Sequence, residues 1–237
     1  MIGLGTLINT GAVVAGGVLG GVVGKLFDDE QRESLNKASG VSVLFIAIAG
    51  AMEGMLQIDQ GALSSGKSML VVLCLALGTV VGELIGIERA FERFGEWLKI
   101  KTGNAGDRGF VNAFVTTSLT VCVGAMAIVG AIQDGIYGDY SILATKGVLD
   151  FIIIAVMASA MGKGAVFSAV PVGLWQGTVT ILARLLEPLM TEAALDNISL
   201  VGNIMIFCVG INLLFPKTLR VANMLPGLVI AAAFACF

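Results

Sequence analysis

The chain of 237 residues contains no histidine. Histidine is the general base of Ser-His and Cys-His catalysis, a haem ligand and the commonest ligand of transition metals. Its absence excludes those catalytic classes and nearly every transition-metal site. An H-E-x-x-H motif and a G-x-S-x-G elbow are also missing. We therefore do not expect an enzyme or a cofactor.

Charge is scarce as well. Only 13% of the residues are charged and 57% are apolar, with a mean hydropathy of +0.94, whereas about 25% of a soluble domain is charged. A soluble fold of this length has no interior large enough for so much hydrocarbon. Repeated apolar runs of about twenty residues match the thickness of a bilayer. Nothing alternates as membrane strands do, so an all-α integral membrane protein is predicted.

Cysteine and proline are rare. The four cysteines lie in apolar runs without a C-x-x-C pair and are expected to be reduced packing residues. They are Cys74, Cys122, Cys208 and Cys236.

The first segment, MIGLGTLINT, has no basic residue, so it is expected to stay in the protein and span the membrane.

Eight membrane spans are predicted from the apolar runs. Their approximate ranges are 4–26, 38–56, 68–87, 110–133, 145–161, 165–186, 199–215 and 218–236. The basic loop 89–108 is expected in the cytoplasm. Alternation then places eleven of the 14 lysines and arginines inside and three outside. Both chain ends are therefore predicted outside.

One sequence pattern recurs. Residues 41–51 and 121–131 share Val, Val, Ala, Ile, Gly and Ala at the same spacing, and residues 199–210 echo them faintly. In the eight-span order, spans 1–3 and 6–8 are five positions apart. Because five is odd, corresponding spans of the two triplets would cross the membrane in opposite directions. A structural repeat that relates them would therefore be an inverted repeat that flanks spans 4 and 5.

Residues 87–101, IERAFERFGEWLKIK, separate apolar from basic side chains on a helix. They predict an amphipathic helix in the headgroup layer, or alternatively a hinge that couples two half-bundles. Two glycine stripes are expected to bring helices close together, either within one chain or at a homodimer seam. They are Gly16, Gly20 and Gly24, and Gly78, Gly82 and Gly86.

Four motifs resemble one known family. GLGTLINTGAVVAGGVLGG opens the chain, VGAMAIVGAIQDGIYGD and GLWQGTVTILA follow, and VANMLPGLVIA closes it. They are similar to the YdfK/YqgA-like family of uncharacterised bacterial integral membrane proteins. The resemblance covers essentially the whole chain. It implies a multi-pass protein of the bacterial cytoplasmic (inner) membrane, and it carries over no substrate and no site residue.

Polar side chains inside the spans are candidates for function, because each is costly in lipid. Asp150 is also expected to pair with Lys146, four residues earlier. Gln176 follows Pro171, and Asn223 precedes Pro226, so both are predicted to lie beside broken helices. The predicted polar lining of a solute or ion site is Glu53, Gln133, Asp134, Asp150, Gln176, Asn203, Asn212 and Asn223. Helix-to-helix hydrogen bonds or interfacial positions are the structural alternative, also for Asn9 and Asn112.

These observations favour a secondary transporter of a small solute, with a coupling ion of unknown identity. An ion channel and a non-transporting assembly subunit remain alternatives. The expected partners are the lipid bilayer, a small solute and a second copy of the chain, and nucleic acid is not expected. Substrate, coupling ion and direction are not encoded in any motif.

Overall fold

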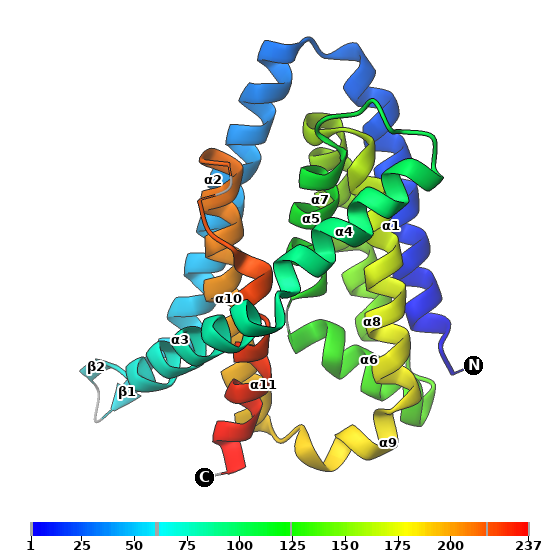
Figure 1. Ribbon diagram of the computed structural model, residues 1–237. Helices are drawn as coiled ribbons and strands as arrows, with labels where there is room; N and C mark the ends of the chain where they lie inside the picture. Colours follow the sequence, from blue (N-terminus) through cyan, green and yellow to red (C-terminus); the bar gives the residue numbers. More distant parts are fainter. Residues whose placement is uncertain (1, 60–61, 124, 217, 237) are drawn as a thin grey trace.

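The computed structural model describes residues 2–59, 62–123, 125–216 and 218–236 (Figure 1). Its elements are α1 (Leu4–Val23), η1 (Gly24–Leu26), α2 (Asp29–Met55), β1 (Leu56–Asp59), β2 (Ala62–Ser65), α3 (Ser68–Ile85), α4 (Ile87–Lys101), α5 (Phe110–Cys122), α6 (Ala125–Tyr137), α7 (Ser141–Met161), η2 (Lys163–Ser168), α8 (Ala169–Ile181), α9 (Ala183–Leu186), η3 (Glu187–Leu189), α10 (Glu192–Leu214), η4 (Val221–Met224), α11 (Pro226–Ala233) and η5 (Phe234–Cys236). The all-α membrane class is confirmed. A small antiparallel hairpin, β1–β2, was not predicted.

The number of spans differs from the prediction. In the described residues, six helical segments are long and apolar enough to cross a bilayer, and the bent pair α5–α6 would make a seventh. The final apolar segment, Val221–Ala233, is shorter than the roughly twenty residues that a span needs. The predicted count of eight is therefore not confirmed.

The long helices pack in pairs. The helix α1 lies against α7, α2 against α10, and α3 against α11, while α1 also contacts α8. The predicted inverted repeat would relate α1 to α8, α2 to α10 and α3 to α11. Each of these pairs is in contact, but the repeat itself stays a prediction.

The predicted cytoplasmic loops gather at one end of the bundle. Asp29 and Arg32 after α1, Gly109 before α5 and Met161 at the end of α7 line one shallow cavity there. In Figure 1 the α1–α2 connection lies at the top and both chain ends lie towards the bottom. Three of the four loops predicted in the cytoplasm therefore share one end of the bundle. Which end faces the cytoplasm stays a prediction.

The first glycine stripe packs inside the chain. A Cβ atom on Gly16 would collide with the Phe151 carbonyl, and one on Gly20 with that of Ala155. Small residues let helix backbones approach in lipid, where no hydrophobic effect drives them together. Gly24 meets Ser159 in the same way, and Gly78 and Gly82 face Gly227 and Asn223. These faces are filled by the same chain, so the predicted homodimer would need another seam.

Adding one methyl group to this stripe should therefore be costly. We expect Gly20→Ala to lower the free energy of unfolding by about 1–3 kcal/mol, because the colliding atoms belong to the α7 backbone. Gly21→Ala is the matched control, since no described atom lies within 4 Å of a Cβ there. It should be neutral or stabilising by up to about 1 kcal/mol. Denaturation of both variants in detergent would test this, and equal stabilities would contradict it.

The predicted fourth span is broken. The chain leaves α5 at Val123, whose φ of -82° and ψ of 127° are extended, and α6 follows at an angle of 64°. The echoed segment 41–51 is continuous helix within α2. The break therefore occurs in only one of the two echoed segments.

The prolines do not break helices internally. Pro171 is the third residue of α8, and Pro226 is the first residue of α11. Both stand in a first turn, where the missing N–H has no helical partner to lose. The sequence placed Pro171 inside a continuous span, whereas the irregular backbone is the 3₁₀ segment η2 just before it.

The amphipathic helix 87–101 forms as α4 with the predicted limits. Its apolar face packs on α5: the rings of Phe94 and Phe114 lie edge to face with centroids 5.8 Å apart, and Gly95 faces Phe114. Figure 1 shows α4 crossing the front of the bundle after α3. Gly86, with φ of 75°, makes the turn between α3 and α4. The apolar face therefore covers the protein core rather than facing lipid alone.

Candidate functional site

Two amides in the bundle interior lack ordinary hydrogen bonds. Asn9 of α1 is 0% exposed and Gln176 of α8 is 1% exposed. Neither atom of the Gln176 amide makes a hydrogen bond with any described residue, and the Asn9 amide makes none of ordinary geometry, although it interacts with the Asp150 carboxylate. Such a group costs about 1–3 kcal/mol relative to a bonded one, so it needs a water or a ligand. Two such amides in one bundle mark a candidate binding site.

A buried ion pair lies beside these amides. Lys146 and Asp150, one turn apart on α7, are 7% and 3% exposed, and their charged atoms are 2.5 Å apart. The Lys146 Nζ also donates to the Val121 carbonyl at 2.9 Å. Val121 lies in the last turn of α5, so Lys146 binds backbone exposed at the α5–α6 break. The predicted pairing of Lys146 with Asp150 is confirmed.

The apolar cluster that contains Val13, Ile154 and Val172 lies one helical turn from Asn9, Asp150 and Gln176. Thr6 and Thr180 share a hydrogen bond of 3.2 Å, and Val13, Val172 and Val121 form one apolar cluster. Thr6 and Val13 lie on either side of Asn9 along α1. Val172 and Thr180 lie on either side of Gln176 along α8. Asn9 also faces α7, because a Cβ on Gly147 would lie 3.6 Å from its Oδ1. We name Asn9, Lys146, Asp150 and Gln176 the interior polar site.

A second polar region is a cavity of about 1220 Å³ between α4, α5, α10 and the turn before η4. We name it the α4–α5 cavity. Glu83 and Arg220 form an ion pair of 3.1 Å on its wall. The Glu88 carboxylate accepts from the Ala222 N–H at 2.9 Å. Asn212 and Asn223 also line this cavity, whereas Asp150 and Gln176 do not.

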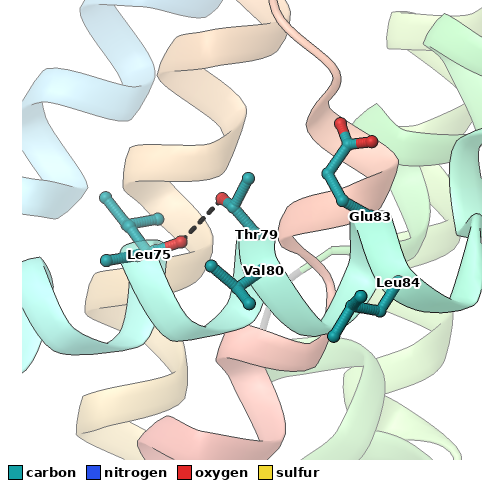
Figure 2. A pocket seen from close by; sticks show the side chains of 6 residues that line it. Leu75, Thr79, Val80, Glu83 and Leu84 are labelled. Carbon is teal, nitrogen blue, oxygen red and sulfur yellow. Dashed lines mark hydrogen bonds between the residues drawn. The ribbon is translucent and has the colours of Figure 1, made fainter.

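The outer face of α3 carries a shallow, mostly apolar depression of about 640 Å³ (Figure 2). The Thr79 hydroxyl there donates to the Leu75 carbonyl at 2.6 Å, so it is bonded within its own helix. In Figure 2 the Glu83 side chain points away from Val80 and Leu84. Because Glu83 is paired with Arg220, the side chains that line this depression offer no free polar group.

Comparison with known proteins now places the chain. The family described as "Protein of unknown function (DUF554)" matches residues 4–236. The chain belongs to the DUF554 family. It is 31% identical over 226 residues to the "Uncharacterized membrane protein YdfK" of Bacillus subtilis (strain 168), covering 95% of this chain and 93% of the relative. No solved structure matches.

A further relative is the "Uncharacterized protein YqgA" of Escherichia coli (strain K12). It is 28% identical over 232 residues, which cover 96% of this chain and 94% of the relative. The family resemblance seen in the sequence is thus confirmed. The function of this DUF554 protein has to be argued from its own site.

The structure assigns backbone partners to three of the predicted site residues. Asp134, 0% exposed, accepts from the N–H groups of Gly3, Gly5 and Thr6 and caps the start of α1. Asn223 accepts from the Glu88 N–H at 2.7 Å at the start of α4. Asn212 bonds both N–H and carbonyl of Leu219 across a turn. These three side chains therefore already have hydrogen-bond partners within the protein.

The other predicted residues are scattered. Glu53 is exposed near the end of α2, and Gln133 is half-buried next to Asp134 on α6. Asn203 packs against Gly50 between α2 and α10, and its amide is 3.4 Å from the Ser199 hydroxyl. Only Asp150 and Gln176 of the predicted set come together in the interior polar site. Binding of a solute or ion by any of the eight stays a prediction.

Two members of the interior polar site were missing from the predicted lining. The sequence pattern predicts Asn9 only as a buried amide and Lys146 only as the partner of Asp150. The signal for Asn9 was its position among the glycines of the first span, where close helix contact leaves an amide no access to water. In the described residues, no three cysteine, aspartate or glutamate side chains come close enough to hold a metal ion.

The sequence also contains one literal phosphate-loop pattern. Residues 61–68 read GALSSGKS, which matches G-x-x-x-x-G-K-[ST]. Such a loop must lie open between a strand and a helix so that its N–H groups surround phosphates. Here 62–65 form β2, paired with β1, and the following helix is the apolar α3; the first glycine lies outside the described residues. The context therefore does not support a nucleotide site.

The stability of the folded protein should depend on pH through Glu88, which lines the α4–α5 cavity. Burial raises the pKa of its carboxyl group, against the opposing effect of the Ala222 hydrogen bond. A carboxyl group with a raised pKa binds its proton more tightly in the folded state, so its contribution to stability is lost as the pH rises through that pKa. We expect Glu88→Gln to remove this loss. Thermal midpoints between pH 4.5 and 8 should fall less steeply for the variant, whereas exposed Glu30→Gln should follow the wild type.

Proposed function

We propose that this DUF554 protein moves a small polar solute across the membrane through the interior polar site. The observation that carries the proposal is the buried Gln176 amide, whose oxygen and nitrogen both lack a partner among the described residues, together with the Asn9 amide beside the Asp150 carboxylate. Apolar side chains at these positions would be more stable in a purely structural bundle, because they leave nothing unbonded. Free amides are what a site needs if a solute supplies their partners for part of the time.

The surrounding backbone supports the same conclusion. Transporters commonly bind substrate where a helix is interrupted, since the interruption frees carbonyl and N–H groups inside the membrane. The break between α5 and α6 lies next to the site, and Lys146 already holds the Val121 carbonyl there. Movement of α6 relative to α5 would change the contacts of Lys146 and could open the site to one side.

The chemistry of the site favours a solute without net charge. Lys146 and Asp150 neutralise each other at 2.5 Å, and the free groups are neutral amides that both donate and accept hydrogen bonds. A polyol, an amide or a zwitterion could bond to them. An ion of one sign would leave the buried pair electrically unbalanced, which is costly at low dielectric.

The test is uptake into liposomes that contain the purified protein. A panel of labelled polyols, small amides and zwitterionic amino acids should include at least one solute that accumulates above empty liposomes with saturable kinetics. Linear, non-saturating conductance in planar bilayers would instead indicate a channel. Absence of flux for every class, with folded protein in the liposomes, would contradict the proposal and favour an assembly subunit.

A further inference from the structure

The α4–α5 cavity contains donors that the protein does not use. Arg93 and Arg108 line it without a hydrogen bond or ion pair to any described residue. The Thr116 side chain also lines it, and no described group bonds its hydroxyl, although the residue is only 8% exposed. Guanidinium groups cannot accept hydrogen bonds, so two of these three side chains can be satisfied only by an acceptor.

The start of α5 adds further donors at the same place. The N-cap residue Gly109 offers no side-chain cap, although its own N–H donates to the Asp107 carboxylate at 2.9 Å, and Asn112 in the first turn lines the cavity. Uncapped N–H groups and the positive end of a helix dipole favour an anion. Thr116 follows Asn112 by one turn, so both side chains lie on the face of α5 that borders the cavity.

The carboxylates of the cavity do not cancel these charges. Glu83 is paired with Arg220, Glu88 is held by the Ala222 N–H, and Glu96 is 3.7 Å from Lys99. Glu88 and Glu92 are the lining carboxylates without a cationic partner, and Arg89, Arg93 and Arg108 are the lining arginines without an ion pair in the described chain. These five groups sum to one positive charge, which is left for a ligand.

The rest of the lining is apolar. Val115, Leu119 and Val209 form part of the wall, and the mouth carries Trp97, which is 53% exposed. An apolar wall makes no favourable contact with free phosphate, whereas it can pack against the glycerol and acyl chains of a lipid. The cavity also lies under α4, the helix that the sequence places in the headgroup layer. Basic pockets between helices at this depth are suited to lipid headgroups.

We propose that the α4–α5 cavity binds an anionic phospholipid, with the phosphate held by Arg93, Arg108, Thr116 and the start of α5. The lipid stabilises the contact of α4 with α5. This site is separate from the interior polar site, and it does not depend on solute transport. Its preference should be for phosphatidylglycerol over phosphatidylcholine, because the headgroup of phosphatidylcholine brings its own positive charge.

The experiment uses the full chain purified in a neutral detergent. Phosphatidylglycerol, phosphatidylcholine or inorganic phosphate is added, and bound lipid is counted by native mass spectrometry while the thermal midpoint is recorded. Phosphatidylglycerol should bind and raise the midpoint of the wild type. Each arginine removed should weaken binding about fivefold, and Thr116→Val about tenfold.

The variants are Arg93→Gln with Arg108→Gln, and Thr116→Val. Arg184→Gln is the matched control, because Arg184 is an exposed arginine on α9 far along the chain from the cavity. The arginine variants remove exposed side chains that make no hydrogen bond or ion pair with a described residue, so their lipid-free midpoints should equal the wild type. Equal phosphatidylglycerol binding by wild type and double variant would overturn the site. An equal response to inorganic phosphate would overturn its assignment to a lipid.

Discussion

Replacement of Lys146 by methionine should lower the free energy of unfolding by about 3–5 kcal/mol. Methionine has nearly the length of lysine but cannot donate a hydrogen bond. Asp150 would then be a buried carboxylate without its cation, and the Val121 carbonyl would lose its donor. Breaking a buried pair on one side is costly because the charge that remains has neither water nor a partner.

The double variant Lys146→Met with Asp150→Leu separates the pair from its surroundings. An apolar pair of similar volume is often as stable as the buried ion pair. We expect the double variant to recover most of the stability and to lose solute uptake. Denaturant titration of the two single variants and the double variant measures the coupling. A single Lys146→Met variant as stable as the wild type would show that water reaches Asp150.

Replacement of Gln176 by leucine should abolish uptake and leave the protein at least as stable. The amide has no partner to lose in the described structure, and leucine of similar size removes a buried polar group. The expected gain in stability is up to about 1–3 kcal/mol. Loss of function together with gain of stability is the signature of a side chain kept for a ligand. Uptake and the thermal midpoint are measured on the same preparation.

Thr178→Val is the matched control on the same helix. The Thr178 hydroxyl is exposed and bonds the Leu174 carbonyl of its own turn at 2.7 Å, so its loss should change neither property. Asp134→Ala is a poor test of transport, because Asp134 caps α1 and its removal would unfold the start of the helix. Undiminished uptake by the leucine variant would remove the interior polar site from the mechanism.

Local patterns predicted much of the fold. The apolar runs located the helices because burial in lipid is a property of consecutive residues and needs no knowledge of neighbours. The face of α4 followed from helical periodicity. The pairing of Lys146 with Asp150 followed from a spacing of four residues, since such side chains share a helix face wherever the helix lies.

Long-range contacts could not be predicted in this way. Asp134 looked like a candidate ligand, but its partners are N–H groups at Gly3, Gly5 and Thr6, more than a hundred residues away along the chain. Asn223 likewise bonds Glu88 across 135 positions. Pro171 suggested a broken helix, whereas the register of η2 places it in a first turn.

The sequence by itself determined the medium and the secondary structure: a chain this apolar dissolves in lipid, and lipid requires helices that satisfy their own backbone. Only the tertiary structure decided which polar side chains are already bonded and which are free. A long-range hydrogen bond forms only where two distant segments come into contact. The sequence pattern of either segment alone does not specify its partner. Asp134 and Gln176 are both polar residues in apolar runs. In the folded protein Asp134 is hydrogen-bonded to backbone N–H groups, whereas Gln176 has no partner among the described residues.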